Sequence, residues 1–184
     1  ISVFDPFVPT ATAGPDLSNC SPNDSVNMAA NTPLFPAQGT WSLVSGTGTI
    51  ADVHDPVTMI TGLSIGDNVF TWTIYNGNCG FGPPTVDTVH VHLFDGAAPL
   101  ADAGTDLSFC TPVAPFNLSG SAVTAPGIGF WSVISGIVTL ADPADPNTAV
   151  TSASIGDNIL VWTVDNGPCG ITTDTMHVTV FNVS

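Results

Sequence analysis

The sequence predicts an all-β protein made of two similar sandwich domains in tandem, and three observations lead to this expectation. One unit of about 90 residues occurs twice in the chain of 184 residues. Each copy consists of short segments rich in Val, Ile, Thr, Phe and Trp, separated by turn residues. The composition, 43% hydrophobic with only 8% charged residues, indicates a chain that buries a core rather than a disordered acidic tail.

The internal repeat is found by shifting the sequence by 90 residues, and it needs no gap over the first 80 positions. About 36 of these 80 positions are identical. They include Trp41 and Trp131, and the Ser-Ile-Gly-Asp-Asn segments that begin at Ser64 and Ser154. A unit of this size is a small independent domain rather than one turn of a solenoid.

The same alignment predicts the domain boundaries. Residues 10–94 and 100–184 are the two repeats, called repeat one and repeat two, and residues 95–99 are a short linker stiffened by proline. The segment Ile1–Phe4 aligns with the last strand of repeat one, so residues 1–9 are expected to be the last strand of a preceding repeat plus a linker. We therefore interpret the chain as two repeats from a longer array.

Each repeat is expected to contain about seven strands. The clearest in repeat one are Val26–Ala29, Thr40–Val44, Thr49–Ala51, Val57–Thr61, Asn68–Tyr75 and Val86–Phe94. Alternation in one of them places Phe70, Trp72 and Ile74 on one face and two threonines on the other. About seven strands in a unit of about 90 residues is typical of an immunoglobulin-like sandwich.

The charge balance excludes several classes of function. The chain has 15 acidic residues and neither lysine nor arginine, which gives a net charge of −15. Nucleic-acid binding by phosphate neutralisation and attraction to anionic lipids are therefore excluded. A Walker-type phosphate loop and a Schiff-base lysine each need a residue that is absent. No apolar run reaches 18 residues, so no membrane insertion is expected.

Several segments resemble a known family of repeats. The segment Pro99–Cys110 resembles the first strand of PKD-type (polycystic-kidney-disease-type) repeats. Gly129–Gly136 and Ile155–Cys169 resemble the PKD-like repeats of large secreted bacterial surface proteins, chiefly in bacteria that use type IX secretion. The resemblance covers essentially the whole chain. It implies an adhesin-type, extracellular protein at the cell surface.

The four cysteines fall as one pair in each repeat, Cys20 with Cys79 and Cys110 with Cys169, both 59 residues apart. Four cysteines allow three pairings, and identical placement in each copy favours a disulfide within each repeat. Such a loop stabilises a domain by about 4 kcal/mol in the chain-entropy model. Disulfides imply an oxidising, extracellular setting.

One motif imitates a catalytic site. Gly62-Leu-Ser-Ile-Gly66 matches the G-x-S-x-G nucleophile elbow, which functions only where a strand turns sharply into a helix. Here the motif lies between two predicted strands, and repeat two lacks its first glycine. A β-turn is therefore expected at Ser64. Since no catalytic constellation is complete and none is repeated, the chain is not expected to be an enzyme.

Recurring aspartates and histidines have two interpretations. Asp52, Asp55, Asp142 and Asp145 lie in two Asp-x-x-Asp-Pro segments, where Asp caps turns or, alternatively, binds Ca²⁺. The turn interpretation is favoured, and no cofactor is required. His90 and His92 share one strand face with the spacing of two metal ligands, but only His90 recurs, as His177. Solvent-facing strand positions are favoured for these histidines.

The aromatic residues divide in the same way. The tryptophans at positions 41, 72, 131 and 162 recur in both repeats and are expected in the core. Aromatic residues without a counterpart are candidates for surface contacts, namely Phe7, Phe35, Tyr75, Phe81, Phe109 and Phe130.

The family resemblance adds a possible modification. Secreted proteins of those bacteria are often O-glycosylated at Asp-Ser/Thr followed by an apolar residue. Ser25, Thr88 and Thr175 fit this pattern, and the last two are equivalent positions in the two repeats. A glycoprotein is the implied hypothesis, with a chance match at a strand start as the alternative.

Taken together, these features favour a non-catalytic structural or adhesive segment: a stiff, disulfide-linked stalk or surface filament. Its expected partners are neighbouring repeats of the same array or filament, and surface glycans. One alternative is a carbohydrate-binding or spacer module of a secreted polysaccharide-degrading enzyme. Another is a filament subunit that assembles by strand addition through residues 1–4.

Overall fold

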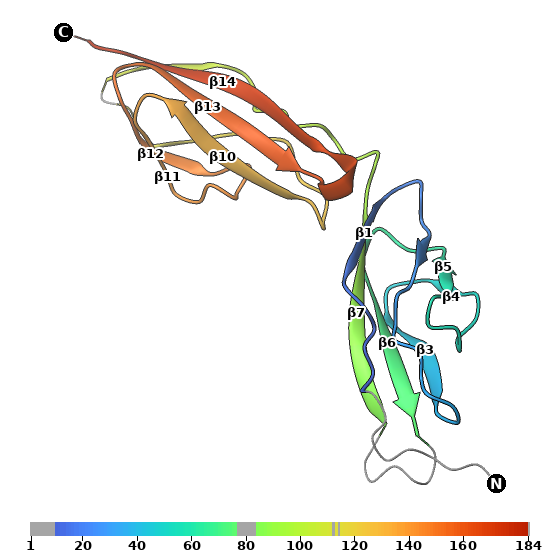
Figure 1. Cartoon of the computed structure of the whole chain (residues 1–184). Coiled ribbons are helices and arrows are strands. Elements are labelled where there is room, and N and C mark those ends of the chain that lie inside the picture. The colour runs from blue at the N-terminus through green and yellow to red at the C-terminus, as the bar shows by residue number, and fades with distance from the viewer. Residues whose placement is uncertain (1–9, 77–83, 112, 114, 184) are drawn as a thin grey trace. The chain divides into compact units, whose positions relative to one another are not determined.

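The computed structural model describes residues 10–76, 84–111, 113 and 115–183. The chain divides into two compact units, Ile1–Gly96 and Ala97–Ser184. Each unit is a sandwich of one four-stranded and one three-stranded sheet (Figure 1). Among the described residues, none of the helices is long and apolar enough to cross a membrane.

The described part of repeat one contains seven strands. Its larger sheet has the order β1-β7-β6-β3 and its smaller sheet the order β2-β5-β4. The strands are β1 (Leu17–Cys20), β2 (Val26–Asn27), β3 (Gln38–Ser45), β4 (Thr49–Ile50), β5 (Met59–Thr61), β6 (Gly66–Tyr75) and β7 (Thr85–Phe94).

Repeat two reproduces this topology strand for strand, with sheets ordered β10-β13-β14-β8 and β11-β12-β9. A short 3-10 helix, η2 (Gly167–Cys169), lies in its last hairpin. The strands are β8 (Leu107–Cys110), β9 (Phe116–Asn117), β10 (Ile128–Ser135), β11 (Val138–Leu140), β12 (Ala149–Ala153), β13 (Gly156–Asp165) and β14 (Ile171–Phe181).

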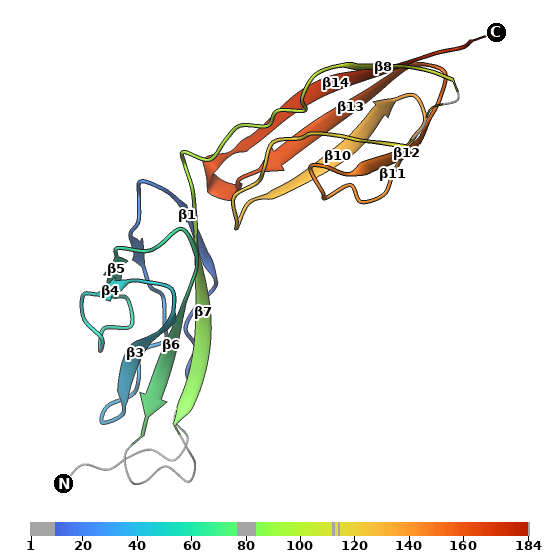
Figure 2. The same ribbon diagram turned by 180° about the vertical axis from the view of Figure 1, so that it is seen from behind.

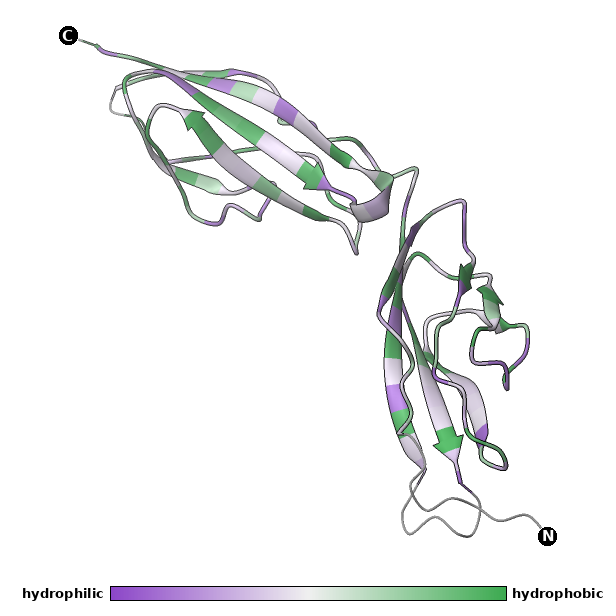
Figure 3. Cartoon of the chain, in the orientation of Figure 1, coloured by the Kyte–Doolittle hydropathy of each residue, from purple (hydrophilic) through white to green (hydrophobic). Residues whose placement is uncertain are grey.

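Alternation along the long strands builds the core, because successive side chains of a strand point to opposite sheet faces. Phe70, Trp72 and Ile74 on β6 are buried, so the predicted face is confirmed. Figure 3 shows the alternation as polar and apolar bands along β7 and β14. All four tryptophans are buried as predicted, in two pairs with ring centroids 5.0 and 5.1 Å apart.

The predicted strand between residues 57 and 61 is shorter than expected. Its first two residues belong to a turn, closed by a hydrogen bond from the Thr58 N–H to the Asp55 carbonyl oxygen. Strand β5 therefore begins at Met59. The turn forms because the two residues before Val57 are aspartate and proline, which favour turn conformations.

Candidate functional site

The first and last strands of each repeat lie side by side and run in the same direction. In repeat one, residues 17–20 of β1 pair in parallel with residues 91–94 of β7. In repeat two, residues 107–110 of β8 pair in parallel with residues 178–181 of β14, which Figure 2 shows from behind. The segment by which the chain enters a repeat is thus bonded to the segment by which it leaves.

Side chains extend this pairing beyond the strand β1. The Thr85 Oγ1 accepts the Ala11 N–H at 2.9 Å, and the Asp87 Oδ2 accepts the Ala13 N–H at 2.8 Å. The Asp16 Oδ1 accepts the N–H of His90 at 2.8 Å. We call residues 11–21 and 85–94, together with their counterparts 101–111 and 172–181, the terminal-strand clamp of each repeat.

Repeat two has the same three side-chain bonds. The Thr172 Oγ1 accepts the Ala101 N–H at 2.9 Å, and the Asp174 Oδ2 accepts the Ala103 N–H at 2.8 Å. The Asp106 Oδ1 accepts the N–H of His177 at 2.8 Å. The recurrence of these aspartates in the sequence was visible, but their role was missed. Asp16 and Asp106 keep their spacing to the Ala-Gly segment of their own repeat, but Asp87 and Asp174 lie 74 and 71 residues after the alanines that they bond, so no fixed spacing pointed to these contacts.

A buried asparagine closes the hairpin end of each sandwich. The Asn68 Oδ1 accepts from the Thr47 N–H at 2.9 Å and from the Ser64 Oγ at 2.8 Å. Its Nδ2 donates to the carbonyl oxygens of Ser64 and Val91 at 2.9 and 3.2 Å. Asn158 repeats these bonds to Ile137, Ser154 and Val178.

This network explains the motif that imitates a nucleophile elbow. The Ser64 hydroxyl donates to the Asn68 side chain, as the Ser154 hydroxyl does to Asn158. The turn interpretation of Ser64 therefore agrees with its contacts. Gly46 has a positive φ of 81°, and a Cβ at this position would collide with Asn68, so only glycine fits there.

The Asp-x-x-Asp-Pro segments form turns in both repeats. The Asp52 and Asp55 carboxylates accept the main-chain N–H two residues further along, at 2.9 and 3.0 Å. Asp142 and Asp145 do the same at 3.0 and 2.8 Å. These contacts are those of the favoured turn interpretation. The Trp41 indole donates to the carbonyl oxygen of Asp55, which ties this turn to the core.

Each repeat has a histidine paired with an aspartate on the outer face of its larger sheet. The His90 Nδ1 lies 2.8 Å from the Asp67 Oδ2, and the His177 Nδ1 lies 2.9 Å from the Asp157 Oδ2. The hydrogen bond to the aspartate, followed by its charge, raises the pKa of both histidines above the ordinary value of 6.5.

These raised pKa values predict a pH-dependent stability. Because the folded pKa exceeds the unfolded pKa, the stabilisation is complete below pH 6.5 and is lost as pH rises through the raised value. Thermal melting from pH 6 to 9 is expected to show a falling melting temperature. The double variant His90→Gln, His177→Gln is expected to flatten this decline, and an unchanged decline would contradict the assignment.

The predicted disulfide between Cys110 and Cys169 is wrong. Cys110 is an exposed free thiol, whereas Cys169 is disulfide-bonded. Cys110 lies opposite Phe181 at the end of β14, and Cys169 lies just before the start of this strand of 11 residues. Eleven residues span more than about 30 Å, whereas a disulfide needs Cα atoms within about 7 Å.

In repeat one, Cys20 is disulfide-bonded, and Cys79 lies outside the described residues. A disulfide is therefore present in the chain, but the predicted pattern of one per repeat does not hold. The first four residues, which carry the strand-addition hypothesis, also lie outside the described part of the chain.

Two of the three candidate glycosylation sites lie on the outer faces of strands. Thr88 and Thr175 are exposed, whereas Ser25 is only half-exposed. The preceding residues Asp87 and Asp174 bond to the main chain in the clamp. The aspartate of each Asp-Thr pair therefore already has a structural role, while its threonine hydroxyl faces solvent.

Three of the aromatic residues without a counterpart are exposed, as predicted. They are Phe35, Tyr75 and Phe130, and the first is 91% exposed. Phe109 is half-buried and stacks on Phe116 with ring centroids 4.3 Å apart. Phe7 and Phe81 lie outside the described residues.

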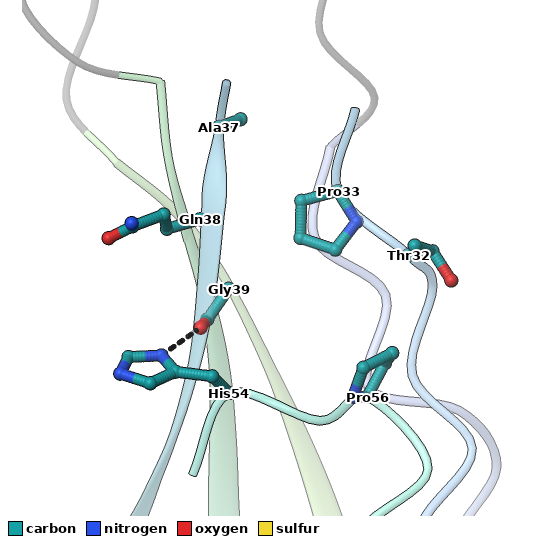
Figure 4. Close-up of a pocket in the computed structure, with 7 residues that line it drawn as sticks. All are labelled: Thr32, Pro33, Ala37, Gln38, Gly39, His54 and Pro56. Atoms are coloured by element: carbon teal, nitrogen blue, oxygen red, sulfur yellow. Dashed lines mark hydrogen bonds between the residues drawn. The ribbon is translucent and has the colours of Figure 1, made fainter. Parts of the chain in front are cut away.

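A cavity of about 360 Å³ lies in repeat one near the start of β3 (Figure 4). Its His54 Nδ1 donates to the Gly39 carbonyl oxygen at 2.8 Å. Repeat two has Val123 and Ala144 at the positions of Pro33 and His54, so this lining is not repeated. The lining residues are Thr32, Pro33, Ala37, Gln38, Gly39, His54 and Pro56.

Comparison with known proteins shows which solved structures have a similar fold. No protein-family model and no curated protein sequence matches the chain. A structure of Sidekick-1 immunoglobulin domains 1–5 is similar with a TM-score of 0.53 and 10% identity, covering 95% of this chain and 39% of that one. Sidekick-1 domains 1–4 give a TM-score of 0.51 and 11% identity, covering 95% of this chain and 50% of that one.

A single PKD domain from the KIAA 1837 protein is also similar, with 24% identity and a TM-score of 0.41, covering 48% of this chain and 91% of that one. The structural neighbours are thus PKD domains and tandem immunoglobulin-like domains. The chain is an all-β protein of two immunoglobulin-like sandwich domains, which is the predicted fold class.

Proposed function

We propose that the chain is a non-catalytic, tension-bearing segment of an extracellular stalk or surface filament. The terminal-strand clamp, present in both repeats with the same side-chain bonds, is the observation that carries this proposal. The disulfide supports an oxidising, extracellular location. Neighbouring repeats and surface glycans are the partners proposed for such a segment, in the setting of secreted bacterial adhesins.

The clamp geometry determines how a repeat responds to a pull at its two ends. The chain enters beside the start of β7, where Ala11 bonds to Thr85, and it leaves at Phe94 beside the end of β1. Tension therefore acts along two parallel strands in opposite directions. All hydrogen bonds between them are loaded together, so they must break together rather than one after another.

The composition suits the same role. The chain offers no lysine or arginine as a cleavage site for proteases of trypsin type. Its 15 acidic side chains repel one another between molecules and keep the surface hydrated. An exposed segment benefits from both properties.

The proposal predicts that weakening the clamp lowers the force at which a repeat unfolds. Asp87→Ala removes the acceptor of the Ala13 N–H, a hydrogen bond to a charged group worth about 1.5–3 kcal/mol. Single-molecule pulling on the full chain, under reducing conditions so that no disulfide limits extension, is expected to show a lower unfolding force for one of two events. Asp174→Ala is expected to lower the unfolding force of the other event.

The matched control is Asp24→Ala. Asp24 is exposed, lies outside the clamp, and its loss changes the net charge by the same amount. It is expected to leave both unfolding forces unchanged. Equal forces for the wild type, Asp87→Ala and Asp24→Ala would refute a load-bearing role for the clamp.

A further inference from the structure

Repeat one carries a cluster of imidazole and carboxylate groups that repeat two has only in part. His90 and His92 lie two residues apart on β7, so their side chains share the outer face of the sheet. Asp67 on β6 pairs directly with His92 in the strand register. The two imidazole rings are stacked with centroids 6.0 Å apart.

The carboxylate of Asp67 divides its two oxygens between the two imidazoles. Its Oδ2 lies 2.8 Å from the His90 Nδ1, and its Oδ1 lies 3.3 Å from the His92 Nδ1. Within the described residues, the His92 Nδ1 is buried and has no hydrogen-bond partner. The His92 Nδ1 therefore faces the Asp67 carboxylate, but no hydrogen bond accounts for this orientation.

We propose that His90, His92 and Asp67 form a binding site for a divalent late transition-metal ion such as Zn²⁺. Two ligands of a tetrahedral zinc ion, each about 2.0–2.2 Å from the metal, lie about 3.3 Å apart. The distance from the His92 Nδ1 to the Asp67 Oδ1 already has this value. The His90 Nδ1 contacts the other oxygen, Oδ2, so the side chains must turn until both nitrogens and a single carboxylate oxygen face the ion.

Among the described residues, no three such side chains are placed so that they could hold a metal ion as they stand, so binding requires a rearrangement. Asp67 is held by a hydrogen bond to His90, and the ion takes the place of that proton between nitrogen and oxygen. The rearrangement involves side chains on the outer sheet face, where His90 and Asp67 are each about two-fifths exposed. Imidazole with carboxylate is a donor set suited to zinc, copper and nickel.

The charge around the cluster favours a cation. The Asp16 carboxylate bonds to the His90 main-chain N–H, and Ser18 lies opposite His92 on β1. The whole chain has no lysine or arginine to compete for the carboxylates. A metal ion on this outer sheet face keeps a coordination position open to water.

Repeat two provides the matched comparison. His177 and Asp157 are the counterparts of His90 and Asp67, but Thr179 stands opposite Asp157 where repeat one has His92. Both oxygens of Asp157 contact the single His177 Nδ1, at 3.1 and 2.9 Å. Repeat two thus keeps two of the three ligands and is expected not to bind the ion.

The test is calorimetric titration of the full chain with Zn²⁺ at pH 7.5, after alkylation of free thiols so that thiolates such as that of Cys110 do not bind. One ion per chain is expected. His92→Thr, which copies repeat two, is expected to weaken binding by more than about tenfold, the loss that even outer-shell partners of a metal cause. Thr179→His, which copies repeat one, is expected to raise the stoichiometry to two.

Two further measurements make the outcome decisive. Imidazole ¹⁵N resonances are expected to shift at the Nδ1 atoms of His90 and His92 on zinc addition, while His54→Ala leaves binding unchanged. Any of three results would overturn the proposal. They are a zinc affinity of His92→Thr equal to that of the wild type, a stoichiometry of one ion per chain in Thr179→His, and no binding to the wild type at millimolar zinc.

Discussion

Replacing Trp72 by alanine is expected to lower the free energy of unfolding of repeat one by about 3–5 kcal/mol, the range for deleting a large buried aromatic side chain. The Trp72 ring is fully buried and packs against Trp41 with centroids 5.0 Å apart. Its Nε1 also donates to the Asn31 carbonyl oxygen at 3.2 Å, so the substitution removes that carbonyl's donor as well. A typical domain has only about 5–15 kcal/mol of stability in total.

The measurement is amide hydrogen exchange, because it reports each repeat of the full chain separately. Protection of β3, β6 and β7 is expected to fall in Trp72→Ala. The counterpart Trp162→Ala is expected to place the same loss in β10, β13 and β14, where Trp162 packs on Trp131. A loss below about 1 kcal/mol would mean that the ring does not support the core, since buried aromatic truncations cost more.

Replacing Asn68 by alanine is expected to cost about 2–4 kcal/mol, because each buried polar group left without a partner costs about 1–3 kcal/mol. The Thr47 N–H loses its acceptor, and the carbonyl oxygens of Ser64 and Val91 lose a donor. The Asn68 side chain joins three parts of repeat one: the turn after β3, the turn before β6, and β7. Its removal is therefore expected to loosen all three. Hydrogen exchange and urea unfolding both measure it.

Two variants separate the hydrogen-bond network from side-chain size. Asn68→Asp keeps the shape but loses the Nδ2 donors and buries a charge, so it is expected to destabilise at least as much as alanine. Asn27→Ala changes an exposed asparagine on β2 and is expected to stay within about 0.5 kcal/mol of the wild type. Similar small losses for Asn68→Ala and Asn27→Ala would contradict the role of the buried network.

Local pattern and internal repetition were sufficient to predict the sandwich class, the core tryptophans and the buried face of β6. Each of these depends on the two-residue period of a strand, which is written directly in the sequence. The same period also places Asn68 on the core face, in phase with Phe70 and Trp72. A polar residue in a core phase, repeated as Asn158, is a signal for a buried hydrogen-bonding residue.

The clamp and the disulfide pattern could not be predicted in the same way. The parallel pairing of β1 with β7 joins residues about 74 positions apart, and its aspartates contact main-chain groups that carry no sequence signal. The cysteine pairing failed because equal spacing along the chain says nothing about strand direction. Parallel β8 and β14 bring Cys110 to the end of the domain opposite from Cys169.

The histidine–aspartate cluster shows the same limit of sequence spacing. His90 and His92 were recognised as possible metal ligands, but no third ligand was evident along the chain. Asp67 is 23 residues before His90 and comes to it only through the antiparallel pairing of β6 with β7. The register that supplies this third group is set by the hairpin as a whole rather than by a local motif.

The central claim, that each repeat is built to bear tension between its ends, is tested most directly by the direction in which repeat one is pulled. Handles at Thr10 and Phe94 load β1 and β7 in shear, whereas handles at Thr10 and Pro84 peel β1 from the same end of β7. The clamp predicts a clearly higher unfolding force for the Thr10–Phe94 pair than for the Thr10–Pro84 pair. Equal forces in the two directions would contradict it.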